Sequence, residues 1–443
     1  MEIRTDADVE VGGGRVGETM RFAVVGCAHG ELDAIYATVE ESERTSGKKV
    51  DAVLCCGDFQ AVRNLDDLQC MAVPDKYKRM NSFYRYYSGE KKAKWLTIFV
   101  GGNHEAINHL WELYYGGWVA ENIYFLGFAG VVNLGGLRIA GLSGIYHDRD
   151  YKMGHFEFQD QQLQRGLRSS YHVRQTEVFR LLQIKQPVDI FLSHDWPRRV
   201  QDHGNREQLL QKKPFFRRDM ETGRLGNPAL EDILHTLKPA HWFAAHLHVK
   251  FAAVVRHPSN GTCDHHTKFL ALDKPIPGRD FMQIFEIPTT EDATLKYDAE
   301  WLSILCTFHA QLNLHRRPLP VPQVDAECER SLACNLTRTH EILQKNGKEI
   351  PLNFVPTAPV YEHESRTRRG AVPASIRRSP QTVQFLSLLG LEYNLHLDRR
   401  ERDFRNPEEI DLGEDDGAAA ANDGQPQACN PEEIDLGSEE EDV

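Results

Sequence analysis

The sequence lacks the features that would place it in a membrane or in a secretory pathway. No apolar run reaches the length of about 20 residues that a helix needs to cross a bilayer. The first twenty residues are acidic and rich in glycine, and they contain no apolar segment typical of a secretory signal. We therefore expect a soluble, intracellular protein that does not associate with membranes.

Disulfide bonds are also not favoured. The nine cysteines are odd in number and scattered along 443 residues, which is unlike the spacing of a disulfide framework and typical of a reducing compartment. They are Cys27, Cys55, Cys56, Cys70, Cys263, Cys306, Cys328, Cys334 and Cys429.

Basic residues are outnumbered, but the imbalance is confined to the end of the chain. The chain carries 52 basic and 65 acidic residues, a formal net charge of −13. Residues 401–443 hold sixteen acidic and two basic residues, which leaves 50 basic and 49 acidic residues elsewhere. The body of the protein is therefore nearly neutral, and its charge does not exclude an anionic substrate.

The stretch Gly101-Gly102-Asn103-His104-Glu105 carries the first indication of function. It follows residues 95–100, an apolar run rich in β-branched and aromatic residues that predicts a buried strand. Glycines end the strand sharply, and open α/β sheets bind ligands beyond the carboxyl ends of their strands. The amide of Asn103 can ligate a hard cation, and the imidazole of His104 can move a proton.

Similar patterns predict an α/β (α+β) protein. We expect helices over 32–43 and 170–183, and strands over 21–25, 50–56, 95–100, 187–192, 242–245, 250–255 and 267–272, with several short strands within 123–145 and a last strand over 281–287.

Composition divides the chain into four parts. We expect a disordered leader over 1–20, a catalytic domain over 21–287, a smaller and mostly helical domain over 288–400, and a disordered acidic tail over 401–443. The tail contains the octapeptide of residues 406–413, which recurs identically at 430–437. A partner-binding motif and simple sequence drift are both open as explanations of this repeat. We expect the basic stretch 366–378 to be a solvated linker, with nuclear targeting or RNA contact as alternatives.

Five predicted strand ends carry side chains of the metal-ligand type. They are Cys27 with His29, Asp58, Asn103 with His104, His194, and His246 with His248. Read as a strand, residues 246–248 would direct both of their histidines to one face. Five successive coincidences of this kind favour a shared metal centre.

Hydrolysis of a phosphodiester explains these residue types. Two cations about 3.5–4 Å apart can hold the phosphoryl oxygens and activate a water at neutral pH. Asp58 can offer one oxygen to each cation. His29 and His248 would complete one site, and Asn103, His194 and His246 the other.

The order Asp-Xaa-His, Gly-Asp, Gly-Asn-His, His and His-Xaa-His marks the calcineurin-like metallophosphoesterases, and this chain resembles them with Cys27 in place of the first Asp. Cys27 stands where most of that superfamily has Asp, which resembles the RNA lariat debranching enzymes, as do residues 101–106, 111–118, 193–197 and 245–251. The likeness runs from about residue 21 to 287, and more weakly to 391.

This resemblance implies a metallophosphoesterase β-sandwich flanked by helices, and hydrolysis of the 2′-5′ phosphodiester at the branch of excised intron lariat RNA. It places Asp58, Asn103, His194 and His246 at one metal, lines the other site with Cys27, His29 and His248, and makes His104 the general acid. A nuclear location follows from the substrate, with shuttling to the cytoplasm open, and splicing-associated proteins are expected to bind the acidic tail.

Two further sequence features bear on metal and substrate. A Cys27 thiolate would favour zinc in its site, with iron or manganese in the other; the alternative is that this site stays weak or empty. The resemblance also implies a lariat-recognition loop over 142–157, in which Tyr146, His147, Arg149, Tyr151 and Lys152 would contact RNA. An ordinary connecting loop is its alternative.

Two other functions stay open at this point. The chain could be a metallophosphoesterase for another phosphate ester, or a catalytically inactive scaffold that binds partners through its tail. The complete set of metal-type residues argues against the scaffold, and Cys27 together with the loop argues against another ester.

Overall fold

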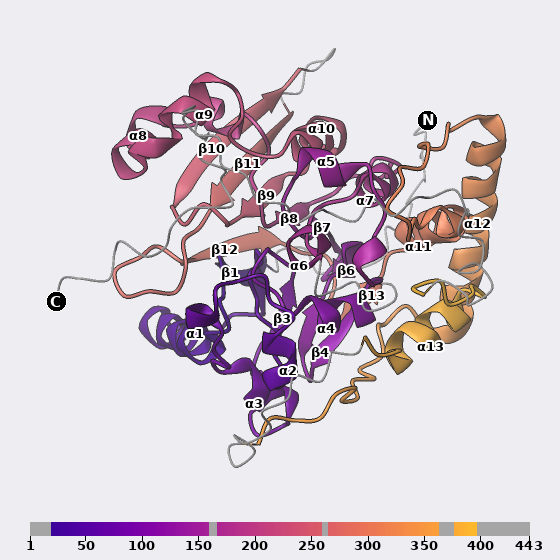
Figure 1. Cartoon of the computed structure of the whole chain (residues 1–443), viewed down its shortest axis with the longest axis horizontal. Helices are drawn as coiled ribbons and strands as arrows, with labels where there is room; N and C mark the ends of the chain where they lie inside the picture. Colours follow the sequence, from indigo (N-terminus) through magenta and orange to yellow (C-terminus); the bar gives the residue numbers. More distant parts are fainter. Residues whose placement is uncertain (1–18, 159–165, 259–264, 363–375, 397–443) are drawn as a thin grey trace, which may run out of the picture. The chain divides into compact units, whose positions relative to one another are not determined.

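The computed structural model describes residues 19–158, 166–258, 265–362 and 376–396 (Figure 1). The leader, the acidic tail with both octapeptides, and most of the basic stretch 366–378 lie outside these ranges. Within them no helix combines the length and hydropathy needed to cross a membrane.

Two mixed β-sheets form the centre of the described chain, and helices accompany both (Figure 1). The first sheet has the spatial order β12 (Met282–Pro288), β1 (Thr19–Val25), β2 (Ala52–Cys55), β3 (Leu96–Phe99), β5 (Ile123–Phe125) and β4 (Gly117–Ala120). The second has the order β10 (Phe251–His257), β11 (His265–Ala271), β9 (His241–Ala244), β8 (Ile190–Ser193), β7 (Leu137–Leu142), β6 (Ala129–Leu134) and β13 (Leu295–Tyr297).

The two sheets share one apolar core, which makes them a sandwich. Because successive side chains of a strand point to opposite faces, alternate residues of a buried strand enter different layers. Phe22 and Val24 of β1 lie in the same apolar cluster as Ile190 and Leu192 of β8, whereas the intervening Ala23 packs with helix residues. This arrangement confirms the predicted β-sandwich flanked by helices.

Helices cover the outer faces of the sheets. Helix α1 (Leu32–Ser46) buries Leu32, Ile35 and Val39, which recur at helical spacing, and it ends at Gly47 in the left-handed conformation that favours glycine. The other helices are α2 (Leu65–Leu68), α3 (Phe83–Tyr87), α4 (Ile107–Glu112), α5 (Asp148–Tyr151), α6 (Leu167–Ser170), α7 (Gln175–Leu181), α8 (Arg206–Lys212), α9 (Arg217–Glu221), α10 (Pro228–Leu237), α11 (Ala299–Thr307), α12 (Ala326–Asn346) and α13 (Pro380–Leu388).

Two predicted elements differ in the structure. The helix expected over 170–183 is interrupted, because His172 forms a parallel bridge with Ile145 and draws residues 171–174 out of helical geometry. The strand over 281–287 is not the last one. Residues 295–297 follow it as β13, which pairs antiparallel with β6 at the edge of the second sheet.

The helical region after residue 288 packs directly on the β-sandwich. Leu302, Leu343 and Leu389 form an apolar cluster of α11, α12 and the end of α13, which lie together in Figure 1. The side chain of Gln381 in α13 hydrogen-bonds both the backbone N–H and the carbonyl of Trp118 in β4, each at 2.8 Å.

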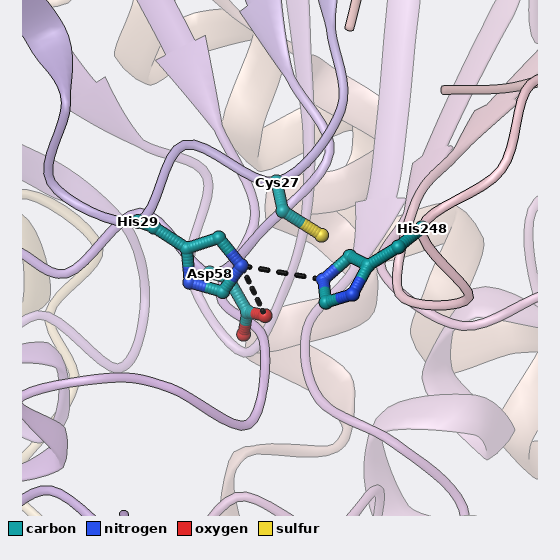
Figure 2. A group of neighbouring side chains, drawn as sticks. All are labelled: Cys27, His29, Asp58 and His248. Atoms are coloured by element: carbon teal, nitrogen blue, oxygen red, sulfur yellow. Dashed lines mark hydrogen bonds and ion pairs between the residues drawn. The ribbon is translucent and has the colours of Figure 1, made fainter. Parts of the chain in front are cut away.

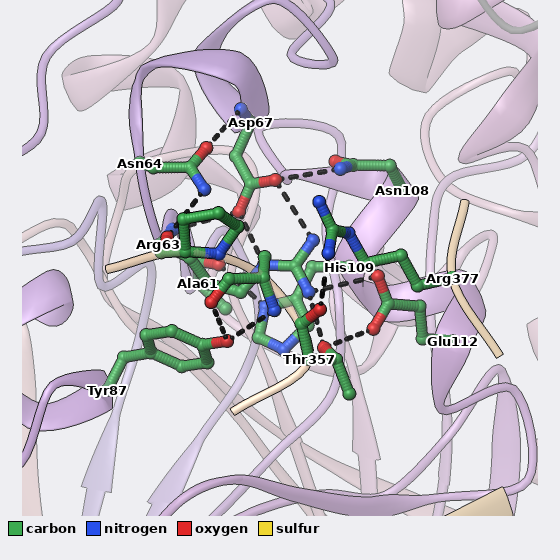
Figure 3. A network of polar contacts seen from close by, with 12 residues as sticks. Ala61, Arg63, Asn64, Asp67, Tyr87, Asn108, His109, Glu112, Thr357 and Arg377 are labelled. Atoms are coloured by element: carbon green, nitrogen blue, oxygen red, sulfur yellow. Dashed lines mark hydrogen bonds and ion pairs between the residues drawn. The ribbon is translucent and has the colours of Figure 1, made fainter. Parts of the chain in front are cut away.

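A buried polar network joins this region to the loop after β2 (Figure 3). Arg63, 1% exposed, donates to Asp67 at 2.7 Å and to Glu112 at 2.9 Å. Arg63 also donates to the Thr357 hydroxyl at 2.8 Å, and this hydroxyl donates to Glu112 at 2.5 Å. The Asn64 amide donates to the carbonyl of Pro359 at 2.8 Å. The region after residue 288 is therefore hydrogen-bonded to the loop that carries Asp58.

Candidate metal centre

Strand topology brings the metal-type residues together. Strands β1, β2 and β3 run parallel in one sheet, and β8 and β9 run parallel in the other. The predicted residues follow the carboxyl ends of these five strands, so segments more than 200 residues apart in the sequence meet at one edge of the sandwich.

Four of them form a compact group (Figure 2). One ligand atom each from Cys27, His29, Asp58 and His248 lies within 4.8 Å of the others. The Nε2 atoms of His29 and His248 are 3.3 Å apart, and His29 Nε2 lies 3.8 Å from Asp58 Oδ2. Imidazole, carboxylate and thiol together are a donor set that suits a divalent transition metal.

The other oxygen of Asp58 faces a second set. His194 Nε2 lies 3.3 Å from Asp58 Oδ1 and 3.1 Å from the amide oxygen of Asn103. The Nδ1 of His194 lies 2.9 Å from the carbonyl oxygen of Cys56. When Nδ1 carries the proton and donates to this carbonyl, the lone pair of Nε2 is available to a metal ion. The ring of His246 lies 4.9 Å from that of His194. The Asp58 carboxylate therefore spans both sets.

Left-handed backbone directs several of these side chains inward. Residues other than glycine seldom adopt positive φ, yet φ is 46° at His29, 45° at Asp58, 62° at His246 and 47° at His248. Such conformations cost about 1–3 kcal/mol each and concentrate at functional sites. The prediction that residues 246–248 form a strand is therefore wrong: β9 ends at Ala244, and the two histidines reach different sides of the centre.

The protonation states of His29, His246 and His248 fit cation binding. Burial lowers the pKa of His29 and of His246 to about 3 and that of His248 well below its ordinary value. These imidazoles are therefore neutral and have free lone pairs. Burial would raise the pKa of Asp58, but neighbouring histidines, His194 first, hold it well below the ordinary range.

Cys27 differs from the other donors. Burial, reinforced by the Asp58 charge, raises the pKa of its thiol well above the ordinary value. The fully buried thiol is therefore protonated until a cation displaces its proton.

Glu105 is a site residue to which the sequence analysis assigned no role. Its buried carboxyl group accepts hydrogen bonds from the backbone N–H groups of Phe59 at 2.7 Å, Gln60 at 2.9 Å and Gly102 at 3.0 Å. It thereby holds the turn that carries Asp58 against the turn that carries Asn103. Its position directly after the Asn-His pair was the available signal.

His104 lies at the opening of the centre. Its backbone N–H donates to Asp58 Oδ1 at 2.8 Å, and its partly exposed ring lies 5.1 Å from that of His29. The side chain is thus beside the ligands and accessible to a substrate, as a proton donor requires.

The predicted recognition loop begins beside the centre. The Tyr146 N–H points to Asp195, the neighbour of His194, at 3.4 Å, and the Tyr146 and Tyr151 rings lie 5.3 Å apart. Arg149 and Lys152 are exposed, whereas the ring of His147 stacks on that of His172, which lies outside the loop.

The chain matches two family models. The model described as "Calcineurin-like phosphoesterase" matches residues 20–250, and the model described as "Lariat debranching enzyme, C-terminal domain" matches residues 264–394. Proteins named lariat debranching enzyme are similar over most of their length. The human protein is 50% identical over 86% of this chain and 71% of its own length. The Arabidopsis thaliana protein is 47% identical over 85% of this chain and 87% of its own, and the Drosophila melanogaster protein is 46% identical over 84% and 78%.

Proposed function

The chain belongs to the lariat debranching enzymes of the calcineurin-like phosphoesterase family, and we propose that it hydrolyses the 2′-5′ phosphodiester at the branch point of excised intron RNA. The observation that carries this function is the Asp58 carboxylate. It lies between the Cys27, His29 and His248 group on one side and the Asn103 and His194 pair on the other.

The chain's own residues prepare this site for a branched phosphate. Neutral imidazoles and the Asp58 carboxylate would hold divalent cations, which supply Lewis-acid activation of the phosphate and of the attacking water. Glu105 fixes the two turns that carry Asp58 and Asn103. His104 is placed to give a proton to the 2′-oxygen as the branch leaves.

We propose zinc on the Cys27 side and iron or manganese on the Asn103 side. A thiolate ligand favours the softer metal, whereas the amide oxygen of Asn103 suits a harder one. Cys27→Ser should lower zinc content and activity together, because a serine hydroxyl is a poor zinc ligand. Unchanged metal content in the purified variant would contradict this assignment.

The loop after β7 would supply the RNA contacts. The exposed Arg149 and Lys152 can meet phosphates, and Tyr146 and Tyr151 can stack on bases beside the branch, with His147 as a further contact. Because the substrate is a product of splicing, we place the protein in the nucleus. The duplicated octapeptide of the tail is our candidate binding motif for splicing-associated proteins.

A debranching assay tests the function. The purified protein should cleave a synthetic branched RNA at its 2′-5′ bond, lose this activity in a chelator, and regain it when divalent metal is restored. A linear RNA of the same composition is the control substrate. Faster cleavage of the linear RNA or of para-nitrophenyl phosphate would instead favour a phosphoesterase for another ester, and inactivity on all three substrates would favour a scaffold.

A further inference from the structure

A second group of metal-type ligands lies outside the candidate metal centre. His147, Asp150 and His172 each offer one ligand atom, and these atoms all lie within 4.8 Å of one another. This is the same spacing that the Cys27, His29, Asp58 and His248 group satisfies. The proposed debranching mechanism uses neither Asp150 nor His172.

Two imidazole nitrogens face one carboxylate oxygen in this group. His172 Nδ1 lies 2.7 Å from Asp150 Oδ2, and His147 Nδ1 lies 3.4 Å from the same atom. The two rings are parallel within 7°, with centroids 4.7 Å apart. His147 precedes α5, Asp150 lies within it, and the bridge between Ile145 and His172 brings the third residue alongside.

One of these nitrogens is unsatisfied. His147 Nδ1 is buried and has no hydrogen-bond partner in the described part of the chain, although 37% of the side chain is exposed. Buried polar atoms are nearly always paired, so an unsatisfied nitrogen of this kind calls for a partner. A cation beside Asp150 would give this nitrogen a partner, and the exposed edge of the ring gives that cation a path from solvent.

The local charge is compatible with a cation. Asp150 is 5% exposed, and the charge of Arg174, a buried neighbour, is neutralised because it donates to Glu157 at 2.6 Å. Arg174 also donates to the backbone carbonyl of Asp150 at 3.0 Å. The contacts of the Asp150 Oδ2 atom are with His172 and His147. Arg149 lies 3.8 Å from Asp150 Oδ1, but it is 69% exposed and therefore screened by solvent.

We propose that His147, Asp150 and His172 form a separate binding site for zinc. Two imidazoles and one carboxylate are common zinc ligands, and three protein ligands leave a coordination position open to water. Zinc here would join α5 to the segment after α6. It would also tie both to the candidate metal centre, because the Gly144 N–H donates to the carbonyl of Gly101 at 2.8 Å. The site would therefore order the loop that faces the RNA.

Zinc stoichiometry tests this site independently of debranching activity. Wild-type protein and the His147→Ala variant are dialysed against the same buffered free zinc and analysed for metal per chain. The variant should bind one zinc fewer. His340→Ala is the matched control, because His340 is an exposed histidine of α12 that belongs to neither group, and it should keep the wild-type number. Circular dichroism confirms that the variants are folded.

A thiolate replacement gives a second readout. His147→Cys keeps a ligand at this position, so loading with cobalt should produce thiolate-to-cobalt absorption beyond that of the cobalt-loaded wild type. Equal zinc content in wild type and His147→Ala, or no added absorption in His147→Cys, would show that the three residues form a hydrogen-bonded cluster only and would overturn the proposal.

Discussion

The carboxyl group of Glu105 holds together the turns that carry Asp58 and Asn103, and the Glu105→Gln variant would remove one of the three hydrogen bonds that it accepts. The amide oxygen of glutamine can still accept from Phe59 and Gly102. Its NH₂ group would instead face the N–H of Gln60, which now donates to Glu105 at 2.9 Å. One buried N–H group therefore loses its acceptor.

The size of the effect follows from that single orphaned donor. Leaving a buried N–H unsatisfied costs about 1–3 kcal/mol. At about 1.4 kcal/mol per tenfold change, this corresponds to roughly 5- to 150-fold. Losing a contact that orients a metal ligand typically costs about 10- to 100-fold in metal affinity or activity. The two estimates agree, so we expect a loss of that order in Glu105→Gln.

The assay is titration of metal-free protein with zinc or manganese in competition with a chelating dye, followed by a debranching assay on the same samples. Glu121→Gln is the matched control, since Glu121 is half-exposed and pairs with the surface residue Lys92 at 3.0 Å. Wild-type metal affinity and activity in a folded Glu105→Gln variant would refute the positioning role.

Three other variants test the architecture around the site. In Gly102→Ala the added Cβ would lie 2.3 Å from Asp58 Oδ1, so the folded variant should lose metal binding, whereas Gly223→Ala, whose Cβ meets no atom within 4 Å, should keep it in the same titration. Arg63→Ala leaves two buried carboxylates without their cation and should destabilise the protein by about 3–5 kcal/mol in denaturant unfolding; a loss below 1 kcal/mol would contradict the network. Burial would raise the pKa of Glu177, but His155 and the Tyr114 hydroxyl lower it from 4.5 to about 2. The ionised carboxylate therefore stabilises the fold above pH 4.5. This contribution, about 3 kcal/mol, is lost as the pH falls toward 2. Glu177→Gln should flatten that acid dependence, measured as the melting temperature between pH 6 and pH 3, and an unchanged slope would refute the assignment.

Strand ends were the part of the fold that local sequence could predict. Apolar runs of β-branched residues followed by glycine located β1, β2 and β3, and parallel pairing then placed Asp58 and Asn103 at one edge. Elements that form only by pairing with a distant segment could not be predicted from local sequence. The three residues of β13 become a strand through pairing with β6, and the bridge at His172 interrupts an apparent helix.

The directions of the side chains within the site could not be predicted from the local sequence pattern either. The positive φ of His246 and His248 sends them to different sides of the centre, whereas period-two alternation put them on one face. Two of the three backbone N–H groups that Glu105 binds lie more than 40 residues away in the sequence, so local sequence could not predict those contacts.

We propose that Asp58 holds the cations that activate the branch phosphate. The most direct test of this proposal is the rate of 2′-5′ bond cleavage in a synthetic branched RNA by wild type and by Asp58→Asn at equal metal concentration. We expect metal-dependent cleavage by the wild type and a loss of activity in Asp58→Asn greater than the roughly 100-fold expected when a residue that only hydrogen-bonds a metal ligand is replaced. Cleavage by folded Asp58→Asn at the wild-type rate would contradict it.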